Sequence, residues 1–327
     1  MNKNMKKVII LAALVAVAAT TNVVINTFER PTAKITARII DETGAPVVGA
    51  NVRLAFSRAM DDNAVVNVEG RTDAQGEFAG EGHCRGDFGA SVSKERFYFS
   101  GLNVSKFTNA IDGKWQPWNP ICETILRPMV KPVALYAKIV KLRIPKLDKP
   151  CGFDLEASDW VAPYGKGVKS DFIFTLHQED RGMQDYDVLG ELTFKNPLDG
   201  LQEVSQPVVK YSVFKWERQA PESGYQTKFQ LQNSWHKGNG ITRSFKFGNG
   251  IWEGYFFRVR TVEQDGKIVS AHYGKIRGGI EVFPNDPNPK IDFTYYFNPT
   301  PNDRNLEWDM KKNLFGGLKD MESPREP

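Results

Sequence analysis

The sequence predicts an all-β protein with two domains, a small β-sandwich followed by a larger β-sandwich or jelly-roll-like domain. Apolar and polar residues alternate along residues 34–40 and 51–56, which is the period of a strand with one buried face. Residues 264–266 read Gln-Asp-Gly between two alternating runs, and Asp-Gly at such a place is a strong hairpin signal. The chain is also rich in glycine and proline, with 28 and 19 residues, and few stretches have helical periodicity.

The first two strands are separated by a turn segment at residues 41–44. This Asp-Glu-Thr-Gly stretch ends the first strand, because glycine reaches positive φ without steric cost and aspartate bonds forward into a turn. Pro46 lacks a backbone donor and belongs at a strand entry or edge. The expected inner faces of the two strands are Ile35, Ala37 and Ile39 in the first and Val52, Leu54 and Phe56 in the second.

The same region contains a longer pattern in two parts. Asp-x-x-Gly-x-Pro-Val-x-Gly-Ala-x-Val begins at residue 41, and Thr-Asp-x-x-Gly-x-Phe begins at residue 72. Together they resemble the carboxypeptidase regulatory-like domain, a transthyretin-like (prealbumin-like) β-sandwich, over residues 33–100. The residues that fit are Asp41, Gly44, Pro46, Val47, Gly49, Ala50, Val52, Thr72, Asp73, Gly76 and Phe78. The resemblance implies a fold but no activity, since such modules are non-catalytic accessories of many exported proteins.

The amino terminus has the pattern of a secretory signal peptide over residues 1–18. Lysines precede an apolar run at 8–15, and Ala-Val-Ala at 16–18 provides a small-residue cleavage site. The alternative is an uncleaved membrane anchor, but the apolar run is shorter than the roughly 20 residues that a membrane-spanning helix needs, so we expect cleavage and no transmembrane span afterwards. The protein is therefore predicted to reach the periplasm, the cell surface or the medium.

The net charge of the mature chain is predicted to be close to zero. The whole chain has 43 basic and 39 acidic side chains, and three of the lysines lie in residues 1–18, which contain no acidic residue. A nearly neutral protein gives no reason to expect nucleic acid as a partner.

The composition along the chain suggests where the domains begin and end. We expect the carboxypeptidase regulatory-like sandwich at 30–129, a second β-rich domain at 130–316 and a flexible polar tail at 317–327. In the second domain, strands are predicted at 171–177, 188–194, 208–216 and 291–297. The glycine-rich segment 234–240 is interpreted as a flexible turn, because the order of a phosphate-binding loop is absent.

Three cysteines, Cys84, Cys122 and Cys151, would meet oxidising conditions after export. Their spacing fits neither a Cys-x-x-Cys redox motif nor a zinc site, and no metal or cofactor is predicted. We expect either a Cys122–Cys151 disulfide across the domain junction or three buried thiols that pack as small apolar side chains.

The first candidate binding site is the loop at 109–120, which contains Trp115 and Trp118 among proline and asparagine residues. Flat indole rings cover the apolar face of a sugar, while amide side chains bond its hydroxyls, so the loop could form a carbohydrate platform. The alternative is that both rings pack under the loop and close one end of the first sandwich.

The second candidate site lies at residues 151–167, the densest polar and aromatic cluster in the chain. Its carboxylates and aromatic rings would suit a carbohydrate site, a calcium site or a general acid/base pair. In the structural alternative the aspartates cap turns and the tryptophan belongs to the core. The candidate ligand-binding residues are Asp154, Asp159, Trp160 and Tyr164, with Glu156 as a further carboxylate.

No catalytic residues are predicted. The sequence has neither Gly-x-Ser-x-Gly nor His-Glu-x-x-His, and its four histidines are scattered. We therefore expect a non-enzymatic, exported binding or structural protein of the cell envelope or extracellular space, whose partner is a glycan or another envelope protein. The alternatives are a glycosidase-like hydrolase that uses the carboxylates at 154–159, and a subunit of a surface assembly whose sheet edges or tail make the contacts.

Overall fold

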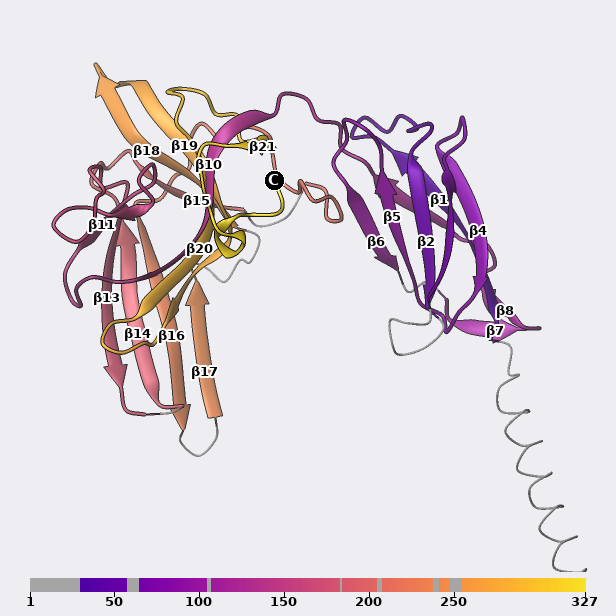
Figure 1. Ribbon diagram of the computed structural model, residues 1–327, viewed down its shortest axis with the longest axis horizontal. Helices are drawn as coiled ribbons and strands as arrows, with labels where there is room; N and C mark the ends of the chain where they lie inside the picture. The colour runs from indigo at the N-terminus through magenta and orange to yellow at the C-terminus, as the bar shows by residue number, and fades with distance from the viewer. Residues whose placement is uncertain are drawn as a thin grey trace, which may run out of the picture. The chain divides into compact units, whose positions relative to one another are not determined.

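The computed structural model confirms the all-β fold class. It describes residues 30–57, 65–104, 107–182, 184–204, 208–237, 241–247 and 254–327. Strands dominate these residues, and the one helical element is a short 3-10 turn, η1 (Asp320–Glu322) (Figure 1). The chain divides after Pro128 into two compact units, beside the boundary predicted near residue 130. The predicted signal peptide lies outside the described residues.

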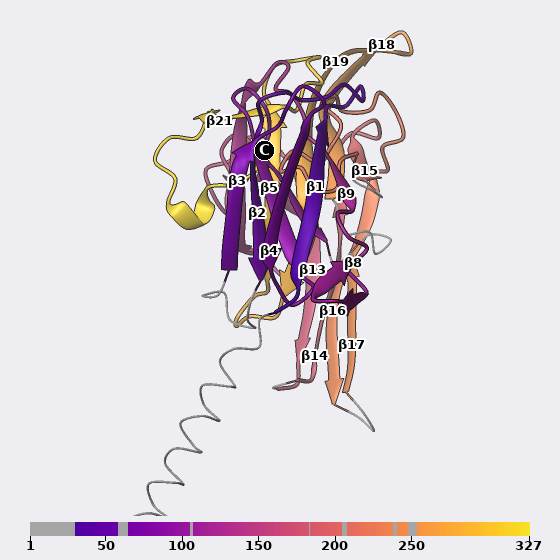
Figure 2. The same cartoon turned by 90° about the vertical axis from the view of Figure 1, so that its right-hand side faces the viewer.

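The first unit is a sandwich of two sheets (Figures 1 and 2). One sheet has the order β4-β1-β8-β7, with β9 also paired to β1, and consists of β1 (Thr32–Ile40), β4 (Glu77–His83), β7 (Asn109–Ile111), β8 (Lys114–Gln116) and β9 (Ile121–Ile125). The other has the order β3-β2-β5-β6 and consists of β2 (Asn51–Ser57), β3 (Val65–Arg71), β5 (Phe88–Ser93) and β6 (Ser100–Val104).

The core of this unit contains the faces that alternation predicted. The six apolar side chains expected to point inward on β1 and β2 are at most 2% exposed and belong to one core cluster. Because side chains of a strand alternate between faces, one buried face per sheet is enough to bring two sheets together.

The first unit contains two aspartate turns, one that follows β1 and one that joins β3 to β4. Asp41 accepts hydrogen bonds from the backbone N–H groups of Thr43 and Ala45, at 2.8 and 3.0 Å. Asp73 does the same for Gln75 and Glu77, both at 2.9 Å. Each turn contains a glycine at positive φ, and a Cβ at the second of these, Gly76, would lie 2.5 Å from a main-chain oxygen. In both Asp-x-x-Gly segments, therefore, the aspartate accepts hydrogen bonds from the turn backbone and the glycine provides the positive φ.

The second unit is a larger sandwich of two six-stranded sheets (Figure 1). The first has the order β15-β18-β19-β20-β10-β21 and consists of β10 (Val133–Arg143), β15 (Gly200–Val204), β18 (Gly254–Gln264), β19 (Lys267–Phe283), β20 (Lys290–Asn298) and β21 (Trp308–Asn313). The second has the order β12-β11-β13-β14-β16-β17 and consists of β11 (Cys151–Asp154), β12 (Asp159–Trp160), β13 (Phe172–Asp180), β14 (Tyr186–Thr193), β16 (Lys228–Lys237) and β17 (Ile241–Phe247).

Aromatic side chains from both sheets form the core of this unit. Phe172 of β13 packs edge-on against Phe257 of β18, with ring centroids 5.3 Å apart. It also meets Phe293 of β20 at 6.2 Å. The first pair is edge-to-face, one of the arrangements that aromatic rings prefer, and the second is tilted.

The hairpin predicted at Gln264-Asp265-Gly266 is confirmed. Gln264 pairs with Lys267 across a two-residue turn in which Asp265 and Gly266 have φ of 52° and 74°. Positive φ at both central positions defines the turn type for which Asp-Gly is favoured.

Three local predictions are wrong. Residues 208–216 form an irregular segment rather than a strand. Phe214 and Trp216 are nevertheless buried there, since apolar side chains can fill a core from an irregular segment. Residues 234–237 end strand β16 rather than begin a turn, while 238–240 lie outside the described residues. The loop at 109–120 contains the short hairpin β7–β8, which turns at Asp112-Gly113.

The predicted Cys122–Cys151 disulfide is not formed. Cys122 is 1% exposed within the core of the first unit, and Cys151 is 1% exposed within the core of the second. Burial also raises the pKa of the Cys151 thiol. These cysteines therefore pack as small apolar side chains, which was the alternative to the bridge.

The expected flexible tail is instead attached to the second unit. The hydroxyl of Tyr296 donates to the backbone oxygen of Glu326 at 2.5 Å, and Arg277 forms an ion pair with the Glu326 carboxylate. Lys138 pairs with Glu322 at 3.3 Å. The polar composition that suggested disorder supplies the groups that make these contacts.

Candidate functional site

The tryptophan platform predicted at residues 115 and 118 is not formed. Trp115 packs with the core of the first unit, and its Nε1–H donates to the backbone oxygen of Cys84 at 3.0 Å. Trp118 is 37% exposed, and the ammonium of Lys114 lies 5.1 Å from the centre of its ring. One ring closes the end of the sandwich and the other is exposed, so they do not present a common face.

The aspartates of the second predicted site cap turns. Asp154 is 4% exposed and accepts four backbone hydrogen bonds, from residues 156, 157, 168 and 169, at 2.8–3.2 Å. Burial alone would raise the pKa of Asp154, but these four N–H groups outweigh it and lower the pKa. Asp159 accepts from the backbone N–H groups of Trp160 and Lys166, at 2.8 and 3.0 Å. Both carboxylates therefore hold the loop in shape.

The aromatic residues of this predicted site do not act together. Trp160 is 5% exposed and packs edge-on against Phe153 and Phe174 in the core. Tyr164 is exposed. Asp154 and Asp159 thus cap turns and Trp160 belongs to the core, as the alternative to a binding site had it.

An arginine that sequence reasoning missed organises this region. Arg260 of β18 donates two hydrogen bonds, both 2.7 Å, to the carboxylate of Asp171, and a third of 2.5 Å to Glu156. Its guanidinium also lies 3.5 Å from Asp154. We call these four residues the buried arginine cluster.

The buried arginine cluster joins the two sheets of the second unit. Burial alone would lower the pKa of Arg260, but the Asp171 and Glu156 carboxylates outweigh it and raise the pKa, so the guanidinium stays charged. Asp154, Glu156 and Asp159 are all engaged in structural contacts, which disfavours the glycosidase-like alternative, since that chemistry needs a carboxylate pair facing substrate.

A groove elsewhere in the second unit combines aromatic rings with polar side chains. Tyr186 of β14 and Trp235 of β16 are register partners across the two strands, with ring centroids 6.5 Å apart. Val188, the next residue on the same face of β14, is fully buried, so the pair continues the core face to the end of the sandwich. We call this the aromatic groove; its volume is about 530 Å³, and it is lined by Asp180, Gly182, Gln184, Tyr186, Trp235, Pro284 and Asn285.

Hydrogen bonds hold the walls of the aromatic groove. The hydroxyl of Tyr186 donates to Asn233 Oδ1 at 3.2 Å, and Asn233 in turn donates to the backbone oxygen of Val282 at 2.7 Å. Gln178 exchanges two hydrogen bonds with the backbone of Asn285, at 3.1 and 3.2 Å, which ties the β19–β20 loop to β13. The groove is therefore largely preformed.

A second arginine lies in the β13–β14 turn beside the aromatic groove. Arg181 contacts Glu179, Asp185 and Asp187 at 2.7–2.9 Å, and we call these four residues the exposed arginine cluster. His236 adds contacts to Asp185 and Asp187 at 3.3 and 3.2 Å. The pKa of Asp185 is lowered, chiefly by Arg181. Within the described part of the chain, no group of histidine, cysteine and acidic side chains is arranged to hold a metal ion.

The alternation of residues along β16 could have indicated that Trp235 lies on the core face of this strand. Phe229, Leu231 and Asn233 occupy alternate positions and are buried, and Trp235 follows them in the same phase. Tyr186 and the β19–β20 loop offer no comparable signal, because their approach to Trp235 depends on strand register.

Comparisons with known proteins provide no family for this chain. No family model matches, and no curated protein matches significantly. In addition, none of the described residues belongs to a helix long and apolar enough to cross a membrane.

Three solved structures show weak similarity. The match to 3-chlorocatechol 1,2-dioxygenase from Rhodococcus opacus 1CP has 8% identity and a TM-score of 0.25, and it covers 30% of this chain and 60% of that one. The match to hydroxyquinol 1,2-dioxygenase from Pseudomonas putida DLL-E4 has 12% identity and a TM-score of 0.24, and it covers 31% and 58% of the two chains. The match to BcpA, the major pilin subunit of Bacillus cereus, has 12% identity and a TM-score of 0.23, and it covers 86% and 97%. The matched part thus spans less than two thirds of each dioxygenase. TM-scores of this size do not establish a common fold.

Proposed function

We propose that this chain is an exported, non-enzymatic binding protein whose second unit holds a carbohydrate in the aromatic groove. The observation that supports the proposal best is the pairing of Trp235 with Tyr186 at the open end of a sandwich, beside carboxylate and amide side chains. Indole and phenol rings supply apolar area for the face of a sugar ring, and Asp180, Gln184 and Asn285 supply hydrogen-bonding groups for its hydroxyls.

The size and charge of the groove agree with a neutral or cationic sugar. Its volume of about 530 Å³ falls within the roughly 300–1,000 Å³ of small-molecule sites. Among the described residues that line it, Asp180 is the one that carries a charge, and its carboxylate accepts from the backbone N–H of Gly182 at 3.0 Å. An acidic sugar would meet repulsion there.

In this proposal the first unit is a carboxypeptidase regulatory-like module with an accessory role. The two Asp-x-x-Gly turns support it, because they give Asp41, Gly44, Asp73 and Gly76, four of the residues that carry the resemblance, a role in the turns. Export rests on the signal-peptide pattern at residues 1–18.

A glycan array with the purified protein tests the proposed function. We expect a neutral or amino sugar to bind, and Trp235→Ala to weaken its binding by at least about tenfold, since an aromatic contact is removed. Trp118→Ala, which removes an exposed tryptophan of the first unit, is the matched control and leaves binding unchanged. An array without hits, or equal binding by a folded Trp235→Ala variant, would refute the proposal.

A further inference from the structure

Strand β10 has an open edge over half of its length. On one side it pairs with β20 from Tyr136 to Arg143. On the other side it pairs with β21 at Val133 and Leu135, and the backbone of Ala137 exchanges two hydrogen bonds with the Asn313 side chain. Pairing on that second side ends there.

The backbone groups of Ile139 and Lys141 point to this open side. In a strand, alternate residues direct their N–H and C=O groups to the same edge, and these two are in phase with Ala137. In the parts of the chain that the structure describes, no hydrogen bond reaches the backbone groups of either residue on this side. An unpaired strand edge of this kind is a template for another strand.

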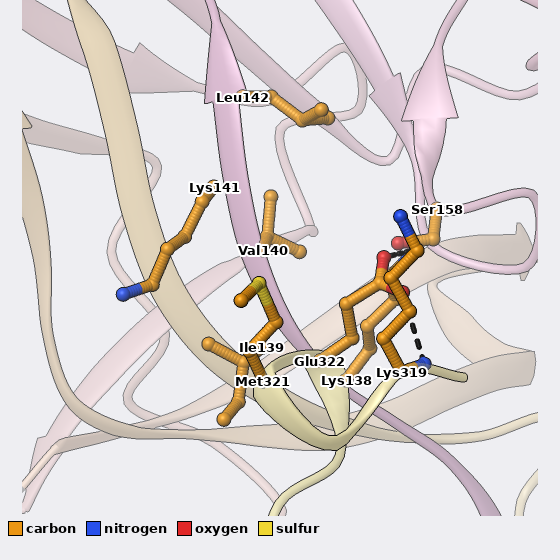
Figure 3. A pocket seen from close by; sticks show the side chains of 9 residues that line it. All are labelled: Lys138, Ile139, Val140, Lys141, Leu142, Ser158, Lys319, Met321 and Glu322. Atoms are coloured by element: carbon orange, nitrogen blue, oxygen red, sulfur yellow. Dashed lines mark hydrogen bonds and ion pairs between the residues drawn. The ribbon is translucent and has the colours of Figure 1, made fainter.

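A pocket of about 180 Å³ lies along this edge (Figure 3). Its other wall includes Lys319, Met321 and Glu322, which belong to the segment 319–327 that we call the C-terminal strap. The strap is attached by the contacts of Glu322 with Lys138 and of Glu326 with Tyr296 and Arg277. The lining consists of Lys138, Ile139, Val140, Lys141, Leu142, Ser158, Lys319, Met321 and Glu322.

The charge of the pocket favours an anionic ligand. Three lysines and one glutamate line it. Lys138 is neutralised by Glu322 at 3.3 Å and Lys141 by Asp292 at 3.2 Å. Lys319 forms no direct ion pair within the described residues, but its backbone N–H and its charge, together with the charge of Lys138, lower the pKa of Glu322, so this one carboxylate faces two lysines. Lys319 lies with Ser158 on the side of the pocket away from Lys141 (Figure 3).

We propose that the open edge of β10 binds an extended acidic peptide segment of another protein by strand addition. The peptide pairs its main chain with Ile139 and Lys141, and it places a carboxylate against Lys319. Two backbone positions two residues apart, about 6.7 Å along a strand, match the repeat of an extended peptide. This contact is independent of the aromatic groove.

Fluorescence anisotropy with a labelled pentapeptide, acetyl-Thr-Val-Glu-Val-Thr-amide, tests the proposal on the full chain. We expect saturable binding that weakens by at least about tenfold when the central residues are N-methylated, because the backbone donors are lost. Replacing the glutamate of the peptide by glutamine, or Lys319→Gln in the protein, weakens binding about three- to tenfold, since a charge-assisted contact is removed.

Variants of the protein separate strand addition from attraction by surface charge. Ile139→Pro removes one edge donor without touching the β20 pairing, and it abolishes peptide binding while thermal unfolding stays within error of the parent. Lys312→Gln, which removes a lysine outside the pocket, is the matched control and has no effect. If Ile139→Pro does not fold, the N-methylated peptide decides the same question. No saturable binding up to about 1 mM, or equal binding of the N-methylated peptide, overturns the proposal.

Discussion

The two arginine clusters of the second unit have almost the same composition and opposite surroundings. Arg260 meets Asp154, Glu156 and Asp171, and its side chain is 12% exposed. Arg181 meets Glu179, Asp185 and Asp187, and its side chain is 38% exposed. The shortest contacts in the two clusters are similar, 2.5 Å for Arg260 and 2.7 Å for Arg181, so the main difference between the clusters is burial, together with the bidentate Asp171 contact.

Burial decides what such a cluster does for the fold. A buried charge that loses its partners is left without solvation, so breaking a buried ion pair is costly even where forming it gains little. An exposed pair is solvated with or without its partner and contributes little. We therefore expect the buried arginine cluster to hold the two sheets together and the exposed one to affect only the local surface charge.

The largest effect is expected for Arg260→Met. Removing this side chain leaves the carboxylate of Asp171, which is 1% exposed, without its bidentate partner. We expect the free energy of unfolding to fall by about 3–5 kcal/mol, measured by urea titration at pH 7. Arg181→Met serves as the control and leaves the unfolding midpoint unchanged. A loss below about 1 kcal/mol for Arg260→Met would mean that burial does not distinguish the clusters.

An intermediate effect is expected for Glu156→Gln. This carboxylate is 34% exposed, so water compensates for part of the lost ion pair, and the amide oxygen still accepts from Arg260. We expect a loss of about 1 kcal/mol in the same titration. A loss as large as that of Arg260→Met would show that Glu156, rather than Asp171, is the main partner.

The pKa values of one aspartate from each cluster, and their dependence on salt, distinguish the two clusters without any mutation. The pKa values of Asp154 and Asp185 are both below the ordinary value of 3.8, the first because four backbone hydrogen bonds overcome burial and the second because of Arg181. Each carboxylate therefore adds stability that is complete above pH 3.8 and is lost as the pH falls through its lowered pKa.

NMR titration of the side-chain carboxyl carbons measures both pKa values at about 0.05 and 1 M salt. At 1 M the screening length is about 3 Å, so we expect the pKa of Asp185 to return toward its ordinary value. The pKa of Asp154 should hardly move, since this carboxylate is buried and its direct hydrogen bonds to backbone N–H groups are little screened by salt. Equal salt dependence of the two would contradict the comparison.

The smallest effect is expected for Arg181→Gln. The substitution removes three exposed ion pairs, and water solvates the carboxylates that remain. We expect no change of the unfolding midpoint at physiological salt, with a small change only at low ionic strength. Because the β13–β14 turn adjoins the aromatic groove, the same variant also shows whether this charge influences sugar binding.

Local patterns of the sequence were enough to predict the fold class and several elements. Alternation of apolar residues identified the inner faces of β1 and β2, because the side-chain period of a strand is two wherever that strand lies. Asp265-Gly266 identified a hairpin, because the required backbone angles belong to these residue types. In each case the cause lies within a few residues.

The candidate sites could not be predicted in this way, since they depend on residues far apart in the chain. Arg260 and Asp171 are separated by 89 positions, and Tyr186 meets Trp235 only through the register of β14 and β16. The aromatic and acidic residues at 151–167 gave a dense local pattern, yet their environment made them turn caps and core.

By itself, then, the sequence determined that this protein is built from strands, which faces of its first strands are buried and where one hairpin turns. The tertiary structure alone decided which charges are buried, which aromatic rings are exposed and which strand edge stays unpaired. The physical reason is that alternation and turn chemistry act between neighbours along the chain, whereas burial and pairing depend on what the rest of the fold places beside a residue.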